Sequence, residues 1–299
     1  CHGAVKELYK RLNFTKICYI VDADIKGFFD HMKHDWIMKF LNLYIKDPNI
    51  LWLVNKYLKA GVMDEGKLVE NGEGSAQGNI ISPILANIYM HNVLTLWYKF
   101  VIAKESKGEN FLIVYADDFI AGFQYKWEAE KYYKLLKERM EKFGLELEES
   151  KSRMLESGGY LAKSKQKRGE STRLETFDFL GFTFYCGQTR KGTAWMMPKT
   201  SSKKFRQKLK DIKVWLYANR DQKLKKLMGM LNLKLTGHYR YYGVSFNGRM
   251  ISNFKQQVRE MLFKVLNRRS NRKSYIREGF IEMLKYYPLV MPKIYVSLF

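Results

Sequence analysis

Three aspartates in two short stretches of the chain are the residues whose types and spacing could do chemistry. Asp117 and Asp118 are adjacent in the apolar run LIVYADDFI, and Asp24 lies in VDADIKGFFD. Three carboxylates brought to one spot would repel one another unless cations bind between them. Oxygen-only ligands favour Mg²⁺, and a pair of such ions can clamp both oxygens of a phosphoryl displacement. The alternative is an ordinary hairpin turn, where aspartate is common.

The residues around the aspartates predict the elements that must position them. Residues 112–115 and 119–123 are rich in β-branched and aromatic side chains and predict two short strands, with the acidic pair at the turn between them. Residues 17–22 predict a buried strand that ends near Asp24. Asp24 can join the pair only if this strand neighbours the hairpin in one sheet.

The rest of the first two thirds predicts further helices and loops. Helices are expected from the spacing of Ile37, Phe40, Leu41 and Tyr44, and over the ranges 50–60, 84–102 and 127–144. The third should open with Ser82 as its cap and Pro83 at its first position. A glycine-rich hairpin and loop should fill 62–80, a basic polar loop 157–172, and a strand pair 177–187. This order indicates an α+β fold rather than a βαβ array.

From about residue 199 the pattern changes to three or four amphipathic helices, which predict a small bundle. We therefore expect a domain boundary near residues 190–200. The chain has 299 residues and is 46% hydrophobic, enough for two folded cores. It contains no apolar run long enough to cross a bilayer and no signal peptide. Its three cysteines have unrelated spacings, which favours a reducing, intracellular setting.

The charge is distributed unevenly. Residues 1–150 hold 20 basic and 21 acidic side chains, whereas residues 151–299 hold 33 and 9. Such asymmetry is typical of a surface that binds nucleic acid or an anionic membrane. Aromatic residues interleaved with the charge, as in GHYRYYGVSFNGR at 237–249, favour RNA or DNA, because bases stack on rings and guanidinium planes. A solvated basic face without a partner is the alternative.

Four ordered motifs resemble those of the reverse transcriptases: VDADIKGFFD, SAQGNIISPILANIYM, YADD and FLGF, together covering about residues 17–185. The stretches QGNIISPILANIYMHNVL, LTGHYRYYGVSFN and LNRRSNRKSY further resemble the enzymes encoded by bacterial and organellar group II introns, which also act as maturases. The resemblance implies a right-hand polymerase palm with partial fingers, followed by an all-α thumb bundle. It divides the chain into the end of the fingers at 1–16, the palm at 17–195 and the thumb or maturase domain at 196–299.

The resemblance also implies roles for individual residues. Asp24 and Asp117 would bind two Mg²⁺ ions, with Mn²⁺ as a substitute, beside Asp118 and the backbone carbonyl of Ile25. Phe29 matches the bulky residue that excludes a 2′-hydroxyl, with core packing as the alternative. In a ribonucleotide polymerase that position needs a smaller residue.

Further matches lie along the same motifs. Gln77 and Gly78 match the loop against the incoming nucleotide, although this chain reads QGN where the family usually reads QGG. Lys151 matches the lysine at the leaving pyrophosphate, or is a plain surface lysine. Leu180 and Gly181 match the primer grip; the alternative, which is compatible with that role, is a β-bulge glycine in a core hairpin. The histidines have no zinc-ligand spacing, so they are interpreted as structural or RNA-contacting.

Basic residues of the helical region are candidates for nucleic-acid binding. They are Lys203, Lys204, Arg206, Lys208, Arg240, Arg268, Arg269, Arg272 and Lys273. In the family a fingers region precedes the helix that CHGAVKELYKRL resembles, so a truncated protein is expected, and activity of this piece alone would then be in doubt. No cysteine-rich endonuclease segment is seen in the sequence.

The resemblance implies an RNA-directed DNA polymerase that copies intron RNA and aids splicing and retrohoming. Its partners would be group II intron RNA, an RNA template with a DNA primer, dNTPs, target DNA and a second copy in a homodimer, with no membrane. The setting would be the cytoplasm of a bacterium rather than an organelle. The alternatives are an RNA-binding maturase with little polymerase activity, or a reverse transcriptase from a retron, a diversity-generating element or a CRISPR system.

Overall fold

The computed structural model describes residues 1–60, 62–64, 67–69, 74, 80–269 and 274–299. The chain forms two compact units, which are treated separately below. The first unit comprises Cys1, Arg11–Glu175 and Gln188–Trp195. The second comprises His2–Lys10, Thr176–Gly187 and Met196–Phe299.

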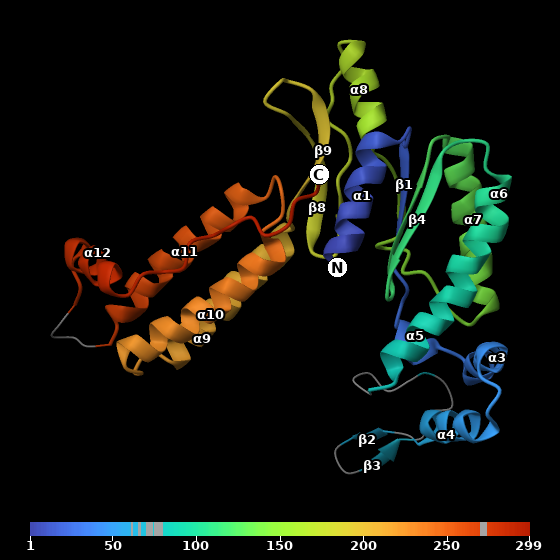
Figure 1. Ribbon diagram of the computed structural model, residues 1–299, viewed down its shortest axis with the longest axis horizontal. Helices are drawn as coiled ribbons and strands as arrows, with labels where there is room; N and C mark the ends of the chain where they lie inside the picture. Colours follow the sequence, from blue (N-terminus) through green and yellow to red (C-terminus); the bar gives the residue numbers. More distant parts are fainter. Residues whose placement is uncertain (61, 65–66, 70–73, 75–79, 270–273) are drawn as a thin grey trace. The chain divides into compact units, whose positions relative to one another are not determined.

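A four-stranded antiparallel sheet forms the centre of the first unit, in the order β4-β5-β1-β6 (Figure 1). Its strands are β1 (Tyr19–Ala23), β4 (Asn110–Tyr115), β5 (Asp118–Phe123) and β6 (Arg153–Glu156). Helix α7 (Lys126–Lys142) packs on this sheet, where Tyr132 meets Phe123 with ring centroids 5.0 Å apart. Since β1 is a central strand, the residues at its end are held on both sides.

Further helices and a short hairpin complete the first unit. They are α2 (Phe28–His31), α3 (His34–Tyr44), α4 (Pro48–Lys59), α5 (Ser82–Met90), α6 (Ala103–Glu105) and α8 (Gly159–Lys167), with the hairpin strands β2 (Val62–Asp64) and β3 (Lys67–Val69). Ile37, Phe40 and Leu41 of α3 are buried, as their helical spacing predicts. Helix α1 (His2–Phe14) belongs to both units.

The helix expected over 84–102 contains two wider turns. After α5 the chain forms the π-helical segments η1 (His91–Thr95) and η2 (Tyr98–Ile102) before α6. Tyr98 and Ile102 are buried, while Phe100 between them is 54% exposed. The prediction that Ser82 caps this helix was wrong, since Ser82 is its first residue and Ile81 occupies the cap position. Pro83 still lies in the first turn, where no N–H is required.

The second unit contains a small sheet and a helical bundle. The sheet has the order β7-β8-β9, with β7 (Phe177–Phe179), β8 (Phe182–Gln188) and β9 (Ala194–Thr200). The long helices are α9 (Ser202–Ala218), α10 (Leu224–Tyr242) and α11 (Gly248–Leu266), and the shorter α12 (Arg277–Tyr286) follows them (Figure 1). Phe205 of α9 packs edge-on against Phe254 of α11, and Phe280 of α12 contacts Phe263.

The structure confirms the α+β class followed by a helical bundle and corrects three local expectations. The segment expected to be a loop at 157–172 contains α8. Strand β6 was not predicted, because its four residues RMLE carry two charges and little β-propensity. Strand β9 was not predicted either, because it contains Pro198. Proline is tolerated there because β9 is an edge strand of its sheet.

None of the helices in the described ranges combines the length and the apolar composition that a bilayer-spanning segment needs.

Candidate functional site

The strand register brings the three aspartates to one edge of the central sheet. β1 and β5 pair Asp22 with Ile120 and Ala23 with Phe119, so the next residue, Asp24, lies level with Asp118. β4 and β5 pair Tyr115 with Asp118, which leaves Ala116 and Asp117 as a two-residue turn. The condition set by the sequence, that the first strand neighbours the hairpin, is therefore met.

The turn itself has an unusual backbone. Ala116 has φ 55°, the left-handed conformation that non-glycine residues rarely adopt. Positive φ at the first central residue alone is the pattern of a type II′ hairpin turn, where glycine is usual. An alanine there costs roughly 1–2 kcal/mol and is kept only where the surroundings over-determine it.

The chain just after β1 directs a carbonyl toward the same edge. The N–H of Lys26 donates to the Glu146 carbonyl at 2.9 Å, and the N–H of Glu148 donates to the Asp24 carbonyl at 2.8 Å. These bonds bracket the bridge between Ile25 and Leu147, which is therefore a non-hydrogen-bonded pair. The Ile25 carbonyl is consequently turned away from residues 146–148, to the side on which β5 pairs with β1.

Lys151 contacts the Asp24 carboxylate. Its Nζ lies 2.6 Å from Asp24 Oδ2, and the Asp24 side chain is 37% exposed. The hydrogen bond to Asp24, helped by the charge of that carboxylate, raises the pKa of Lys151. Ser152, the next residue, accepts the Asp24 N–H at 3.2 Å through its hydroxyl. Lys151 thus has a specific partner at the sheet edge, and Ser152 holds the backbone of that partner.

The donors at this edge suit a hard cation. Asp24, Asp117 and Asp118 offer carboxylates and Ile25 a carbonyl, all of them oxygen ligands that suit Mg²⁺. Within the described ranges, no three acidic, histidine or cysteine side chains are grouped closely enough to hold a metal ion alone. This is compatible with Mg²⁺, which commonly uses one or two carboxylates and completes its shell with water and substrate phosphates.

Phe29 lies in the first turn of α2, five residues after Asp24. Phe28 is buried, at 3% exposure, whereas Phe29 is half-buried and packs against the same core. The two rings meet edge-on with centroids 5.4 Å apart. Phe29 thus has an accessible part as well as core contacts. Gln77 and Gly78, expected near the nucleotide, lie outside the described residues.

Leu180 and Gly181 form a tight turn in the second unit. β7 and β8 pair Phe179 with Phe182, so these two residues alone connect the strands. Leu180 has φ 49° and Gly181 has φ 78°, and positive φ at both positions is the type I′ pattern. The β-bulge interpretation is therefore wrong for Gly181, which belongs to the hairpin turn.

The basic candidates of the bundle fall into two groups. Lys203, Lys204, Arg206 and Lys208 are exposed near the start of α9, and Arg240 is exposed on α10. The first turn of α9 contains no acidic residue, so its cations oppose the helix dipole, an arrangement that a bound anion would offset.

The second group is engaged within the bundle. Arg268 donates to the Tyr217 hydroxyl at 2.8 Å, and Arg269 donates to the Gln222 carbonyl at 3.0 Å. Both side chains therefore tie the end of α11 to the connection between α9 and α10. Arg272 and Lys273 lie outside the described residues.

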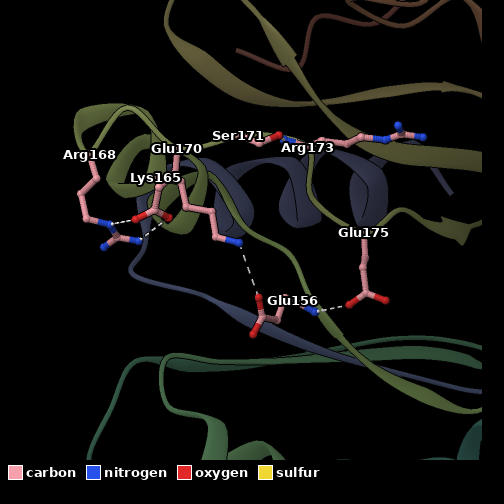
Figure 2. A network of polar contacts seen from close by, with 7 residues as sticks. All are labelled: Glu156, Lys165, Arg168, Glu170, Ser171, Arg173 and Glu175. Carbon is pink, nitrogen blue, oxygen red and sulfur yellow. Dashed lines mark hydrogen bonds and ion pairs between the residues drawn. The ribbon is translucent and has the colours of Figure 1, made fainter.

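Helix α8 and the following segment account for the basic stretch at 163–173 (Figure 2). Lys165 pairs with Glu156 at 3.6 Å, and Arg168 pairs with Glu170 at 2.6 Å. The Glu156 N–H donates to the Glu175 carboxylate at 2.8 Å. This bond ties the segment that follows α8 to the end of β6. Most of these charges are used within the first unit, so this stretch is folded rather than hanging free.

The histidines behave as structural residues where they are buried. His238 stacks on Phe254 with ring centroids 3.7 Å apart. Burial, with a smaller effect of Lys208, lowers the pKa of His238 to about 4. The imidazole is therefore neutral at physiological pH. His34 contacts the Gly74 carbonyl through Nε2 at 2.5 Å.

Two polar residues that hydrogen-bond to the backbone of candidate site residues could not be identified from the sequence. Ser152 carries no motif signal. Tyr241 lies in the stretch selected for aromatic stacking on nucleic acid, yet its hydroxyl donates to the Leu180 carbonyl at 3.0 Å. Such roles depend on contacts between residues far apart in the chain, which spacing alone does not reveal.

Two family profiles match the chain. Residues 5–184 match the profile described as reverse transcriptase (RNA-dependent DNA polymerase). Residues 194–281 match the profile described as group II intron, maturase-specific domain.

Curated relatives match over shorter segments. The group II intron-encoded protein LtrA of Lactococcus lactis subsp. cremoris is 38% identical over 104 residues, 33% of this chain and 17% of the relative. An uncharacterized 91 kDa protein in the cob intron of Schizosaccharomyces pombe is 38% identical over 93 residues, 31% of this chain and 11% of the relative. Protein YkfC of Escherichia coli is 34% identical over 77 residues, 26% of this chain and 20% of the relative. The chain thus matches only a small part of each relative's length.

Two solved telomerase structures, each in complex with a TWJ fragment of telomeric RNA, are also similar. The Candida tropicalis protein has a TM-score of 0.47 at 14% identity, covering 97% of this chain and 53% of that chain. The Candida albicans protein has a TM-score of 0.45 at 15% identity, covering 95% and 50%. Likeness of this degree carries no functional inference.

Proposed function

Because the chain belongs to the reverse transcriptase family, of the kind encoded by group II introns, we propose that it is an RNA-directed DNA polymerase. It would copy intron RNA into DNA and bind that RNA to aid splicing and retrohoming. The family match over 194–281 supports the intron kind over reverse transcriptases of retrons, diversity-generating elements or CRISPR systems. The chain spans only part of its relatives, so the activity is proposed for the protein that contains it.

One observation carries the proposal, namely the register that sets Asp24 level with Asp118 and beside the Asp117 turn. Antiparallel pairing on both sides of β5 holds the carboxylates on rigid strand ends instead of a loose loop. Polymerisation needs such positioning, because the protein accelerates phosphoryl transfer mainly by placement and electrostatics. A plain surface hairpin would not require a central strand ending in a third aspartate at the same level.

We assign roles to the residues of this edge as follows. Asp24 and Asp117, with Asp118 and the Ile25 carbonyl beside them, would hold two Mg²⁺ ions, or Mn²⁺ in their place. Bound there, the ions supply stabilisation of the charge that develops on the attacking and leaving oxygens. Lys151 would neutralise or protonate the leaving pyrophosphate, which requires it to leave Asp24, its partner in the structure described here.

Other residues would select and hold the substrates. Phe29 would exclude a 2′-hydroxyl from the incoming nucleotide with its accessible part, and Gln77 and Gly78 would lie against that nucleotide. Leu180 and Gly181 would hold the primer end. The exposed cations of α9 and α10 would contact template, primer or intron RNA. We divide the chain functionally into the end of the fingers (1–16), the palm (17–195) and the thumb or maturase domain (196–299).

The proposal is tested by primer extension on an RNA template with dNTPs and Mg²⁺. The variant with Asp117→Ala and Asp118→Ala should lose extension by about a hundredfold or more, because it removes the groups that stabilise the transition state. Its affinity for intron RNA, measured in parallel, should stay within about twofold, since the carboxylates add no phosphate contacts.

Asp221→Ala is the matched control, because Asp221 is a surface aspartate of the second unit whose side chain is 80% exposed. Full extension by this control would show that losing an aspartate is not harmful in itself. Absence of extension by the intact full-length protein, with tight binding to structured RNA, would contradict the polymerase and leave an RNA-binding maturase.

A further inference from the structure

The hairpin turn of Leu180 and Gly181 is held on its carbonyl side by residues from the region that matches the maturase profile. The Tyr241 hydroxyl donates to the Leu180 carbonyl at 3.0 Å. The Ser201 N–H donates to the Gly181 carbonyl at 2.9 Å. Both carbonyls of the turn are therefore hydrogen-bonded.

Aromatic packing fixes the tyrosine that makes the first of these bonds. The Tyr241 ring stacks on Phe182, the residue just after the turn, with centroids 6.0 Å apart and planes 10° apart. Phe182 is fully buried and also contacts Tyr242, at 5.3 Å. The hydroxyl of Tyr241 thus reaches Leu180 from a ring that is itself held against the adjoining strand.

A buried amide anchors the second bond. Asn247 is fully buried, accepts the Thr200 N–H at 2.9 Å and donates to the Tyr242 carbonyl at 2.8 Å. Thr200 precedes Ser201, so Asn247 links the end of α10 to the backbone that binds Gly181. Asn247 also donates to the Thr200 hydroxyl oxygen at 2.8 Å, so one side chain satisfies three buried hydrogen-bonding groups and makes this corner rigid.

Leu180 and Gly181 are half-buried, and the turn contains two N–H groups besides these carbonyls. Across the ranges that the structure describes, the N–H groups of Leu180 and Gly181 donate to no partner. The Gly181 N–H belongs to the same planar peptide unit as the Leu180 carbonyl, so the Tyr241 hydroxyl that binds this carbonyl also sets the direction of that N–H.

We propose that Tyr241 is a positioning residue for primer extension: its hydroxyl fixes the Leu180 peptide and so the face that the turn presents to the primer end. This inference rests on the proposed polymerase function and on the role given there to the turn. Tyr241 would touch no substrate atom. Since a small misplacement of reacting atoms is costly, losing one hydrogen bond behind the turn should slow nucleotide addition.

The test is Tyr241→Phe in the full-length protein, because this change removes the hydroxyl and keeps the ring on Phe182. We expect amide hydrogen exchange in residues 177–184 to rise and 2-aminopurine at the primer 3′ end to report a looser terminus. The rate constant of single-nucleotide addition should fall about three- to tenfold, the range for one lost hydrogen bond, while the KM for dNTP and the affinity for primer–template change less than about twofold.

Tyr286→Phe is the matched control, because Tyr286 is 75% exposed at the end of α12 in the same unit. Unchanged exchange at 177–184 in Tyr241→Phe would overturn the proposal, and so would faster exchange with an unchanged rate of addition. A general loss of folding would raise exchange throughout the second unit and weaken primer–template binding, which would also count against it.

The two proposals can fail separately. If the wild-type protein extends no primer, the polymerase function is contradicted. The 2-aminopurine signal then still shows whether the turn grips a primer end and whether that grip needs Tyr241. A primer terminus equally mobile in both proteins would overturn the positioning role.

Discussion

At the scale of single residues, the sheet edge that carries the aspartates combines backbone strain with an ion pair. Ala116 keeps a left-handed backbone at the tip of the aspartate hairpin. The Lys151 ammonium group forms an ion pair with the Asp24 carboxylate. The sequence motifs identify the aspartates as candidate site residues. They do not predict the contact between Lys151 and Asp24, because these two residues are 127 positions apart in the chain.

The role of Lys151 can be tested by substitution. Lys151→Ala should lower the rate constant of nucleotide addition by about ten- to hundredfold, because a charge or a proton donor at the leaving group is lost. Lys151→Arg separates the two effects, since a guanidinium keeps the charge but does not release its proton. Rates are measured in single-turnover extension at saturating dNTP.

Lys142→Ala is the control, because Lys142 is an exposed lysine in the last turn of α7. A rate in Lys151→Ala equal to that of this control would return Lys151 to the class of plain surface lysines. Recovery in Lys151→Arg would indicate charge neutralisation, and no recovery would indicate proton donation.

At the scale of elements, the sequence predicts those helices and strands whose apolar residues recur at a clear spacing or whose ends are marked by glycine. The aspartate hairpin, α3, α4, α7 and the long helices of the bundle were all predicted, because their apolar spacing or flanking glycines are clear. Helix α8 was not, because its nine residues contain four basic or amide side chains after two glycines and little apolar pattern. It is stabilised by tertiary contacts, which override weak local preference.

Gln166 provides the contact by which α8 can be tested. Its side-chain N–H donates to the Gly192 carbonyl at 2.7 Å, and its side-chain oxygen accepts the Ala194 N–H at 2.9 Å. Gln166→Ala removes both bonds and should destabilise residues 188–195 by about 1–2 kcal/mol. Amide hydrogen exchange measured over that segment checks the expectation locally.

The control for this experiment is Gln207→Ala. Gln207 donates to Asp211 one turn away on the surface of α9, a contact that contributes only a few tenths of a kcal/mol. Exchange over 188–195 that responds no more to Gln166→Ala than to this control would mean that the Gln166 amide does not hold the segment.

At the scale of the whole molecule, the charge distribution and the fold class were predictable from the sequence. The relative positions of the candidate site residues were not. The α+β part followed by a basic helical bundle follows from residue types and periodicity. The level of Asp24 with Asp118 depends on strand register, which the sequence alone leaves open. The use of Arg268 and Arg269 within the bundle shows that a basic residue in a basic region is not always available to RNA.

Salt dependence tests where RNA binds. The slope of log affinity against log salt should be strongly negative for the wild-type protein, because binding releases counterions from the phosphates. Replacing Lys203, Lys204 and Arg206 with alanine should make the slope shallower by about two units if each contacts one phosphate of a single strand.

The matched control neutralises three exposed lysines of α7, namely Lys126, Lys131 and Lys134. It should leave the slope within about half a unit of the wild-type value, because those lysines are expected to make no phosphate contact. Equal slopes for the two triple variants would remove the start of α9 from the RNA-binding surface.

The two wide turns η1 and η2 also affect how this chain is compared with others. A π-turn spans about one residue more than an α-turn, so it shifts every later side chain around the helix axis. In η2, Tyr98 and Ile102 are buried, whereas Phe100 is exposed. In an alignment with a relative whose helix is regular throughout, a gap belongs inside this helix, although gaps are customarily moved to loops. Without it, a residue that follows a wide turn would be aligned with a position about 100° away around the helix axis.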